Sequence, residues 1–276
     1  VRTVRKESDM KQITSARCIS CIPEVVPKKR SNNKKLKLLI TNKRIDWGFK
    51  QSMLMIQSRL QQIMRRTGDK VLLITSTIPA EGKTMTSVNM ALAFAQEGMK
   101  VALLDGDLRK PSVSELMKLP EGPGLTEYFR GESTPEEIQV VKDGVTFFRA
   151  GQKKGKVSGL IDEEKMNSLL EKLRKEYDVI LMDAAPSYVF SDAMILSSYA
   201  DKVLYVVRVD KADAKEIRVG MNSFEEKEKL IGYVINRDTG GYISQSGYGY
   251  GRYGKYQKYR KYAELDEETM NTEDTL

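Results

Sequence analysis

Residues 71–87 read VLLITSTIPAEGKTMTS, and most of what the sequence predicts depends on this segment. Its first part is a short, uninterrupted apolar run, which is typical of a strand buried on both faces of a parallel sheet. The part from Gly82 to Thr84 opens a segment with helical character, residues 86–98. Backbone N–H groups at a helix N-terminus are unpaired and lie at the positive end of the helix dipole, so they attract anions. The order strand, loop, helix therefore predicts a phosphate-binding loop.

The loop carries the side chains that a nucleotide with its metal ion requires. Lys83 supplies a positive charge for the terminal phosphates, and the hydroxyl of Thr84 is a typical Mg²⁺ ligand. Thr77 stands where the first glycine of such a loop usually lies, so the match is imperfect. The position between a buried strand and a helix still favours nucleotide binding over a plain turn. The residues expected to contact the nucleotide are Ala80, Glu81, Gly82, Lys83, Thr84 and Met85.

Strand and helix patterns alternate on both sides of this loop. Short apolar runs predict strands at residues 70–75, 100–105, 177–183, 200–209 and 230–236. Helices are predicted at residues 45–66, 86–98, 162–178 and 213–229. The expected fold class is α/β, with a parallel sheet flanked by helices on both faces. Ligands of such sheets bind at the carboxyl ends of the strands.

Acidic residues end two of the predicted strands. Asp105 and Asp107 follow the strand at 100–105, and Asp183 ends the strand at 177–183. A carboxylate at the tip of a buried strand is unfavourable unless it is paired or near a cation. Mg²⁺ prefers oxygen ligands, so a magnesium site is predicted with Thr84, Asp105 and Asp183 as ligands. In the alternative interpretation, each carboxylate caps the helix that follows, which explains one of them well and three poorly.

The two cysteines, Cys18 and Cys21, have the spacing of a redox pair or of half a zinc site. No further cysteine and no histidine completes a set of four ligands. We therefore interpret the alternating segment RCISCIP as a short strand within a polar N-terminal linker. So few cysteines are consistent with a reducing cytoplasm.

Charge is concentrated at the two ends of the chain. Residues 1–44 hold 13 Lys and Arg against 3 Asp and Glu, and the formal net charge is +8. A basic end favours an anionic partner, either membrane lipid or nucleic acid, although a solvated linker is the plainer explanation. Near the other end, residues 247–262 read GYGYGRYGKYQKYRKY, a pattern that no packed core could use. No apolar run approaches the roughly 18–20 residues that span a bilayer.

Taken together, these features resemble the bacterial tyrosine kinases of capsule and exopolysaccharide biosynthesis, which have the P-loop NTPase fold. The similarity runs from about residue 10 to residue 262. It rests on the segments STIPAEGKT, LLDGDLRKP, VILMDAAP followed by SDA, GYVIN, and the tyrosine-rich tail. The segment LLDGDLRKP discriminates best, because it is uncommon among other P-loop ATPases.

The resemblance implies a role for each matching residue around the nucleotide, with ATP and Mg²⁺ as the bound groups. Lys83 would hold the β- and γ-phosphates, and Thr84 would hold the metal. Asp183 would orient a metal-bound water. Asn236 would lie near the adenine, and Arg109 would face the site or a neighbouring subunit.

The resemblance also makes the tail the substrate of the kinase. Asp105 and Asp107 would lie beside the metal and the incoming phenol, and one of them would help to remove its proton. A tyrosine hydroxyl, with a pKa near ~10, is a poor nucleophile at neutral pH, so it must be placed against the γ-phosphate. The expected phosphoacceptors are Tyr242, Tyr248, Tyr250, Tyr253, Tyr256, Tyr259 and Tyr262.

Three regions follow from the resemblance: a juxtamembrane linker (residues 1–40), a P-loop tyrosine kinase domain (41–238) and an autophosphorylation tail (239–276). The expected partner is a membrane-spanning chain-length-regulator region of the same polypeptide, or a separate membrane activator. A homo-oligomer in which each tail enters a neighbour's site is also expected. The basic N-terminal segment suits anionic lipid at the cytoplasmic face of the membrane, and no nucleic acid is expected.

Two other functions remain open on this fold. One is a catalytically weak nucleotide-binding regulator of polysaccharide export, which is favoured by departures from the family pattern. These lie in the loops and in the expected subunit-contact helix, at Ala80, Ala184, Ala185, Trp47, Lys50 and Met53. The other is a membrane-positioning or partition ATPase, but such proteins usually carry an extra lysine early in the loop, and TSTIPAEGKT has none before Lys83.

Overall fold

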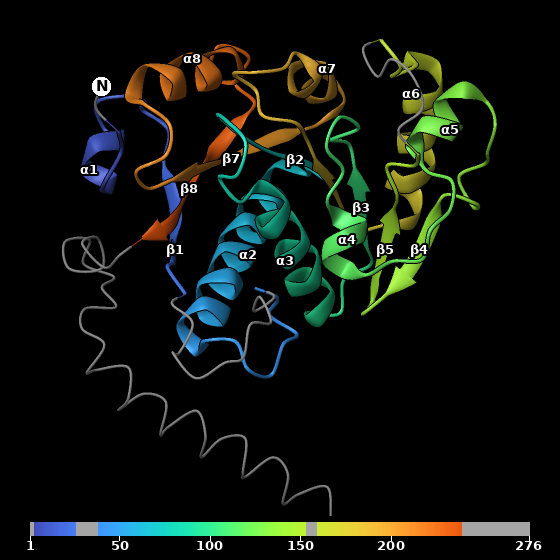
Figure 1. The fold of residues 1–276 in the computed structure, drawn as a ribbon, viewed down its shortest axis with the longest axis horizontal. Coiled ribbons are helices and arrows are strands. Elements are labelled where there is room, and N and C mark those ends of the chain that lie inside the picture. The colour runs from blue at the N-terminus through green and yellow to red at the C-terminus, as the bar shows by residue number, and fades with distance from the viewer. Residues whose placement is uncertain (1–2, 26–37, 153–158, 239–276) are drawn as a thin grey trace, which may run out of the picture.

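The central sheet organises everything that the structure describes, which is residues 3–25, 38–152 and 159–238 of a computed structural model (Figure 1). Over these residues the sheet has eight strands in the order β1-β8-β7-β2-β6-β3-β5-β4. In Figure 1 it runs from β1 on the left to β4 on the right. The strands are β1 (Cys18–Pro23), β2 (Val71–Ser76), β3 (Val101–Asp105), β4 (Gln139–Lys142), β5 (Val145–Phe148), β6 (Val179–Asp183), β7 (Lys202–Arg208) and β8 (Leu230–Asp238).

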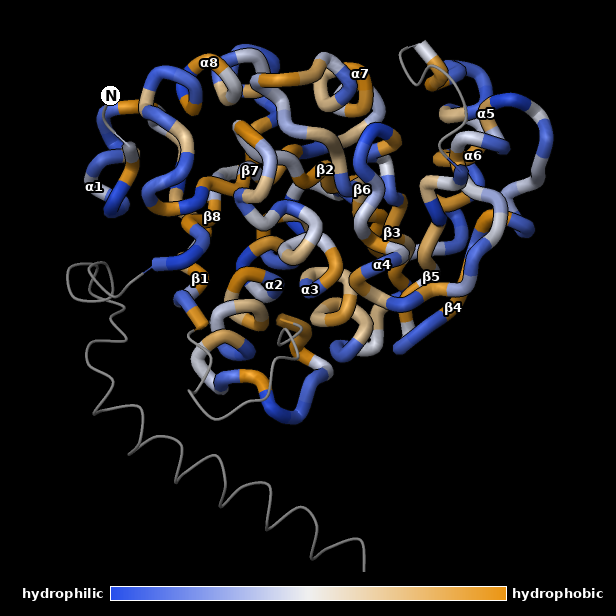
Figure 2. The backbone as a smooth tube through the Cα atoms, viewed as in Figure 1, coloured by the Kyte–Doolittle hydropathy of each residue, from blue (hydrophilic) through white to orange (hydrophobic). Residues whose placement is uncertain are grey.

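Helices cover both faces of this sheet, as the sequence predicted. Along β2 the side chains alternate, so Leu72 and Ile74 pack on one face and Val71 and Leu73 on the other. The first face is covered by α2 (Trp47–Thr67), α3 (Lys83–Gln96) and α4 (Val113–Met117). The second is covered by α1 (Glu7–Met10), α5 (Leu125–Arg130), α6 (Glu163–Glu176), α7 (Asp192–Tyr199) and α8 (Ala214–Glu225). Figure 2 shows the result as hydrophobic strands at the centre and hydrophilic loops around them.

The sheet is parallel throughout except at one edge, where β4 and β5 form an antiparallel hairpin. The sequence analysis did not predict this hairpin. Its turn consists of Asp143 and Gly144, which have φ of 49° and 77°. Two residues with positive φ are the mark of the two-residue turn that the dipeptide Asp-Gly favours. The predicted strands before and after it, β2, β3, β6, β7 and β8, are all confirmed, as are helices α2, α3, α6 and α8.

The N-terminal segment, expected to be a linker with one short strand, is packed into the domain over residues 3–25. The strand is confirmed as β1, which pairs in parallel with β8. Val4 and Met10 are fully buried, and Thr3 bridges to Asp213. A few apolar anchors in a polar segment are enough for this packing, and composition alone does not reveal them. None of the helices in the described ranges is both long and apolar enough to cross a bilayer.

Candidate nucleotide site

The phosphate loop lies between β2 and α3, as predicted, and its backbone makes two left-handed steps. Ala80 has φ of 68° and Gly82 has φ of 99°. A Cβ added at Gly82 would lie 2.2 Å from Nδ2 of Asn236, so only glycine fits there. In the part of the chain that the structure describes, no hydrogen bond takes up the backbone N–H groups of residues 82–85. The loop therefore presents a set of unpaired donors at the start of α3, which is the chemistry that binds a phosphate.

Lys83 joins the loop to two of the predicted carboxylates. Its Nζ lies 2.7 Å from Oδ2 of Asp107 and 3.3 Å from Oδ2 of Asp183. All three side chains are buried or nearly so. Burial disfavours the ammonium, but the charges of Asp183 and Asp107 outweigh it and raise the pKa of Lys83 above its ordinary value. Lys83 thus stays charged at neutral pH and can neutralise a phosphate.

The carboxylate of Asp183 is the centre of a wider network. Thr84 donates from Oγ1 to Oδ2 of Asp183 at 2.7 Å, and Ser87 donates from Oγ to Oδ1 at 2.8 Å. Gly106 approaches so closely that its N–H donates to the backbone oxygen of Asp183 at 2.8 Å. Sequence reasoning missed Ser87, although it lies four residues after Lys83 and therefore on the same face of α3.

Asp105 is fully buried at the end of β3, and one of its oxygens remains available. Oδ2 accepts from the backbone N–H of Val113 at 3.1 Å. Oδ1 is buried and has no hydrogen-bond partner among the described residues. Burial, reinforced by the charge of Asp183, raises the pKa of Asp105 to about 8. A buried, unpaired carboxylate oxygen of this kind fits a nearby cation or its water.

The residues present fit a magnesium ion that shares its ligands with a nucleotide. Thr84, Asp105 and Asp183 offer a hydroxyl and carboxylate oxygens beside the loop. Within the described ranges no three Asp, Glu, His or Cys side chains are grouped closely enough to hold a metal ion by themselves. Mg²⁺ commonly binds through one or two carboxylates together with substrate phosphates, so a three-carboxylate cage is not required.

The side chain of Asn236 packs against the loop, and the side chain of Glu81, a residue of the loop, is buried. Asn236 donates from Nδ2 to the backbone oxygen of Glu81 at 2.7 Å. The side chain of Glu81 turns inward and accepts from the N–H groups of Ile78 and Arg208, at 2.8 and 3.2 Å. Burial raises the pKa of Glu81 to about 7, and these backbone donors limit the rise. The carboxylate of Glu81 is therefore occupied inside the protein, and only the backbone of Glu81 can contact a phosphate.

Arg109 makes its side-chain contacts with the segment after β6. It forms a bidentate ion pair with Asp192 at the start of α7, with Nη2 3.2 Å from Oδ1. Its guanidinium also lies 4.6 Å from the centre of the Phe190 ring. The structure thus joins Arg109 to the segment after β6 and leaves any contact with a nucleotide or a neighbouring subunit as a prediction.

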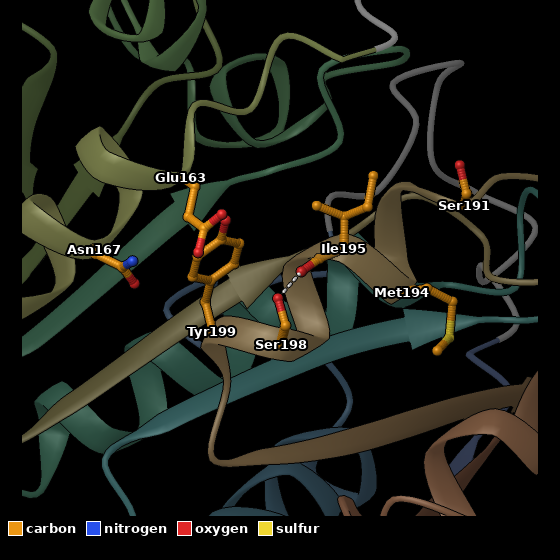
Figure 3. A pocket seen from close by; sticks show the side chains of 7 residues that line it. All are labelled: Glu163, Asn167, Ser191, Met194, Ile195, Ser198 and Tyr199. Carbon is orange, nitrogen blue, oxygen red and sulfur yellow. Dashed lines mark hydrogen bonds between the residues drawn. The ribbon is translucent and has the colours of Figure 1, made fainter.

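A separate cavity of about 570 Å³ lies between the start of α6 and α7 (Figure 3). Its lining includes Glu163, Met194 and Tyr199. No residue predicted to bind the nucleotide or the metal lines it. The predicted phosphoacceptors, Tyr242 to Tyr262, lie outside the described residues.

Comparison with known proteins agrees with this geometry. A family model described as ParA, NUBPL iron-transfer P-loop NTPase, matches residues 68–214. The tyrosine-protein kinase CpsD of Streptococcus pneumoniae is 34% identical over 184 residues, which are 62% of this chain and 78% of that protein. This chain belongs to the bacterial tyrosine-protein kinase family.

Other members of the tyrosine-protein kinase family extend the comparison. YwqD of Bacillus subtilis is 32% identical over 185 residues, covering 66% of this chain and 77% of that protein. The kinase domain of the Escherichia coli tyrosine kinase ETK has the same fold, with a TM-score of 0.76 and 24% identity over 90% of this chain and 99% of that one. The match covers only a quarter of some longer relatives, such as 25% of Ptk from Acinetobacter johnsonii.

Proposed function

We propose that this chain is the ATP-dependent catalytic part of a protein-tyrosine kinase that phosphorylates the tyrosines of its own tail. The observation that carries the proposal is the placement of Lys83 between Asp107 and Asp183 at the start of α3, under a loop of unpaired backbone donors. Membership of the tyrosine-protein kinase family supports it. The unpaired Oδ1 of Asp105 supports a cation beside the loop.

In the proposed reaction, the γ-phosphoryl group leaves ATP, ADP departs, and the phosphorus forms a bond to a tyrosine oxygen. The backbone N–H groups of residues 82–85 bind the phosphates, and Lys83 neutralises their charge. Thr84, Asp105 and Asp183 would hold Mg²⁺, which when bound would supply further charge neutralisation. The phenol proton passes to one of the carboxylates of Asp105 and Asp107, which the family resemblance places beside the incoming phenol.

Phosphotyrosine formation tests this directly. The full chain, incubated with ATP and Mg²⁺, is expected to gain phosphate between Tyr242 and Tyr262, measured by intact mass and peptide mapping. Lys83→Met removes the buried ammonium and is expected to abolish the gain. Lys100→Met removes an exposed lysine from the opposite end of β3 and serves as the matched control. Equal phosphorylation of the wild type and Lys83→Met would contradict the assignment.

We also propose that the kinase acts at the cytoplasmic face of a bacterial membrane and regulates capsular or exopolysaccharide polymerisation and export. The proposed partner is a membrane-spanning chain-length-regulator region or a separate activator. The basic N-terminal segment is proposed to contact anionic lipid. Residues 247–262 hold five Lys and Arg and no acid. Each phosphate adds roughly −1.5 to −2 charges at pH 7, so several would reverse the sign of this tyrosine-rich stretch. That reversal supports a tail that leaves its binding site once it is modified.

A catalytically weak regulator is the second candidate, because Ala80 adopts a left-handed conformation that alanine disfavours. The two candidates differ in one measurement. Binding of ADP with Mg²⁺, together with no phosphate transfer under any activator, would favour the regulator.

A further inference from the structure

The tip of the phosphate loop has a residue that is poorly suited to its own backbone. Ala80 is exposed and has φ of 68°. A residue with a Cβ populates this region less readily than glycine. Contacts from outside the tip can offset this cost.

Arg208, the last residue of β7, makes the contacts that can do so. Its Nη1 donates to the backbone oxygen of Ala80 at 3.0 Å, and its backbone N–H donates to Oε1 of Glu81 at 3.2 Å. Arg208 pairs with Asn236 across β7 and β8, and Asn236 bonds the backbone of Glu81 from the neighbouring strand. The tip of the loop is thus held from the ends of two adjacent strands.

The environment of Arg208 is otherwise unfavourable for a guanidinium. Its Nε is buried and has no hydrogen-bond partner among the described residues. Burial, together with the charge of the nearby Arg237, lowers the pKa of Arg208. A desolvated donor without an acceptor disfavours the folded state, so packing does not explain the choice of arginine at this position.

We propose that Arg208 is a positioning residue, whose guanidinium keeps the phosphate loop in its anion-binding conformation by donating to the carbonyl of Ala80. It acts through the loop and does not touch the nucleotide. This inference rests on the proposed nucleotide binding. The inference implies that nucleotide binding depends on Arg208 only when residue 80 is not glycine, because glycine adopts a left-handed conformation without support.

A double-mutant cycle tests the proposal, with ADP and Mg²⁺ as the probe and the dissociation constant of the full chain as the readout. Arg208→Met is expected to weaken binding about tenfold, as the loss of a charged hydrogen bond allows. Ala80→Gly alone is expected to change affinity by about twofold or less. The double variant is expected to bind within about threefold of Ala80→Gly, because glycine replaces the support. At saturating ATP, the rate of tail phosphorylation by Arg208→Met is expected to match the wild type.

Arg237→Met is the matched control, because it removes a neighbouring arginine that pairs with Glu24. It is expected to bind ADP like the wild type. Equal losses from Arg237→Met and Arg208→Met would assign the effect to charge alone and overturn the proposal. The proposal is also overturned if Arg208→Met weakens ADP binding by the same factor whether residue 80 is alanine or glycine.

Thermal melting identifies a variant that fails to fold. In that case Arg208→Gln, which removes the charge and the guanidinium but stays polar, replaces Arg208→Met in the same cycle with the same criteria. A wild type that binds no ADP would defeat the proposed function itself. A wild type that binds, with Arg208→Met unchanged, would defeat only the role of Arg208.

Discussion

Among single side chains, Asp183 has the most connected position in the site. Its carboxylate meets Lys83, Thr84 and Ser87, and its backbone oxygen accepts from Gly106. A buried carboxylate with this many donors is held in one orientation. The neighbours of Asp183 therefore matter for stability as well as for the reaction.

Ser87 gives a test of that dependence. Ser87→Ala removes a buried donor to Asp183 and is expected to lower the free energy of unfolding by about 1–3 kcal/mol. Ser198→Ala removes a similar hydroxyl, which donates to the backbone oxygen of Ile195 at an exposed position, and is expected to change it by about 0.5 kcal/mol or less (Figure 3). Urea denaturation of both variants measures the difference. Similar values for the two serines would contradict the structural role of Ser87.

Glu81 predicts a pH dependence of stability. Its pKa is about 7 in the folded chain, against an ordinary value of 4.5. Between these values the folded state binds more protons than the unfolded state, so this group's contribution falls as pH rises from about 4.5 to 7. The loss amounts to roughly 3 kcal/mol at most.

The measurement compares the free energy of unfolding of wild type and Glu81→Gln across this pH window. Glutamine cannot ionise, so the variant is expected to lose stability less steeply with rising pH, whatever its absolute stability. Parallel curves for the two proteins would show that Glu81 is not the group that titrates.

For the helices and strands, the sequence predicted those with a strong period or an unbroken apolar run. The strands β2, β3 and β6 and the helix α3 follow directly from such runs. They place Lys83, Asp105 and Asp183 at the carboxyl ends of the central strands. The short helices α5 and α7 were missed, because a few residues carry no clear period. Ser87 and Arg208 were missed for another reason: their roles depend on contacts between segments far apart in the chain, which a local pattern does not contain.

The hairpin of β4 and β5 offers a test at this level. Gly144→Ala places a Cβ at φ of 77°, and the nearest side chain, that of Ala95, would lie at an ordinary 3.5 Å. The expected loss in unfolding free energy is about 1 kcal/mol and comes from the backbone alone. Gly144→Asn is the control, because asparagine tolerates the left-handed region better, so it is expected to lose less. Thermal melting that ranks asparagine below alanine would refute this explanation.

Across the chain as a whole, the end of the described residues lies close to the site. Asp238 ends β8, two residues after Asn236, which bonds the phosphate loop. The tail is therefore attached to its own chain beside the loop. Attachment alone does not decide whether a tail meets its own site or that of a second copy, and we propose the second.

Two complementary variants separate these routes. Lys83→Met keeps the tail as an acceptor, and a chain with all seven tail tyrosines changed to Phe keeps the catalytic site. When both are mixed with ATP and Mg²⁺, phosphate is expected on the Lys83→Met chain, at a rate that rises with the concentration of its partner. Intact mass measures it. Phosphate on wild type alone, with none in the mixture, would show that each chain modifies only itself.

The pairing of β1 with β8 has a consequence for how this protein is made. Cys18 lies beside Tyr233 in the finished sheet, so the first strand has no strand to pair with until nearly all of the described sequence has left the ribosome. At ~5–20 residues per second, translation of the intervening sequence takes on the order of ten to forty seconds. During that interval the apolar segment CISCIP is an unpaired edge that chaperones can bind, and completion of the sheet must be a late event in biosynthesis.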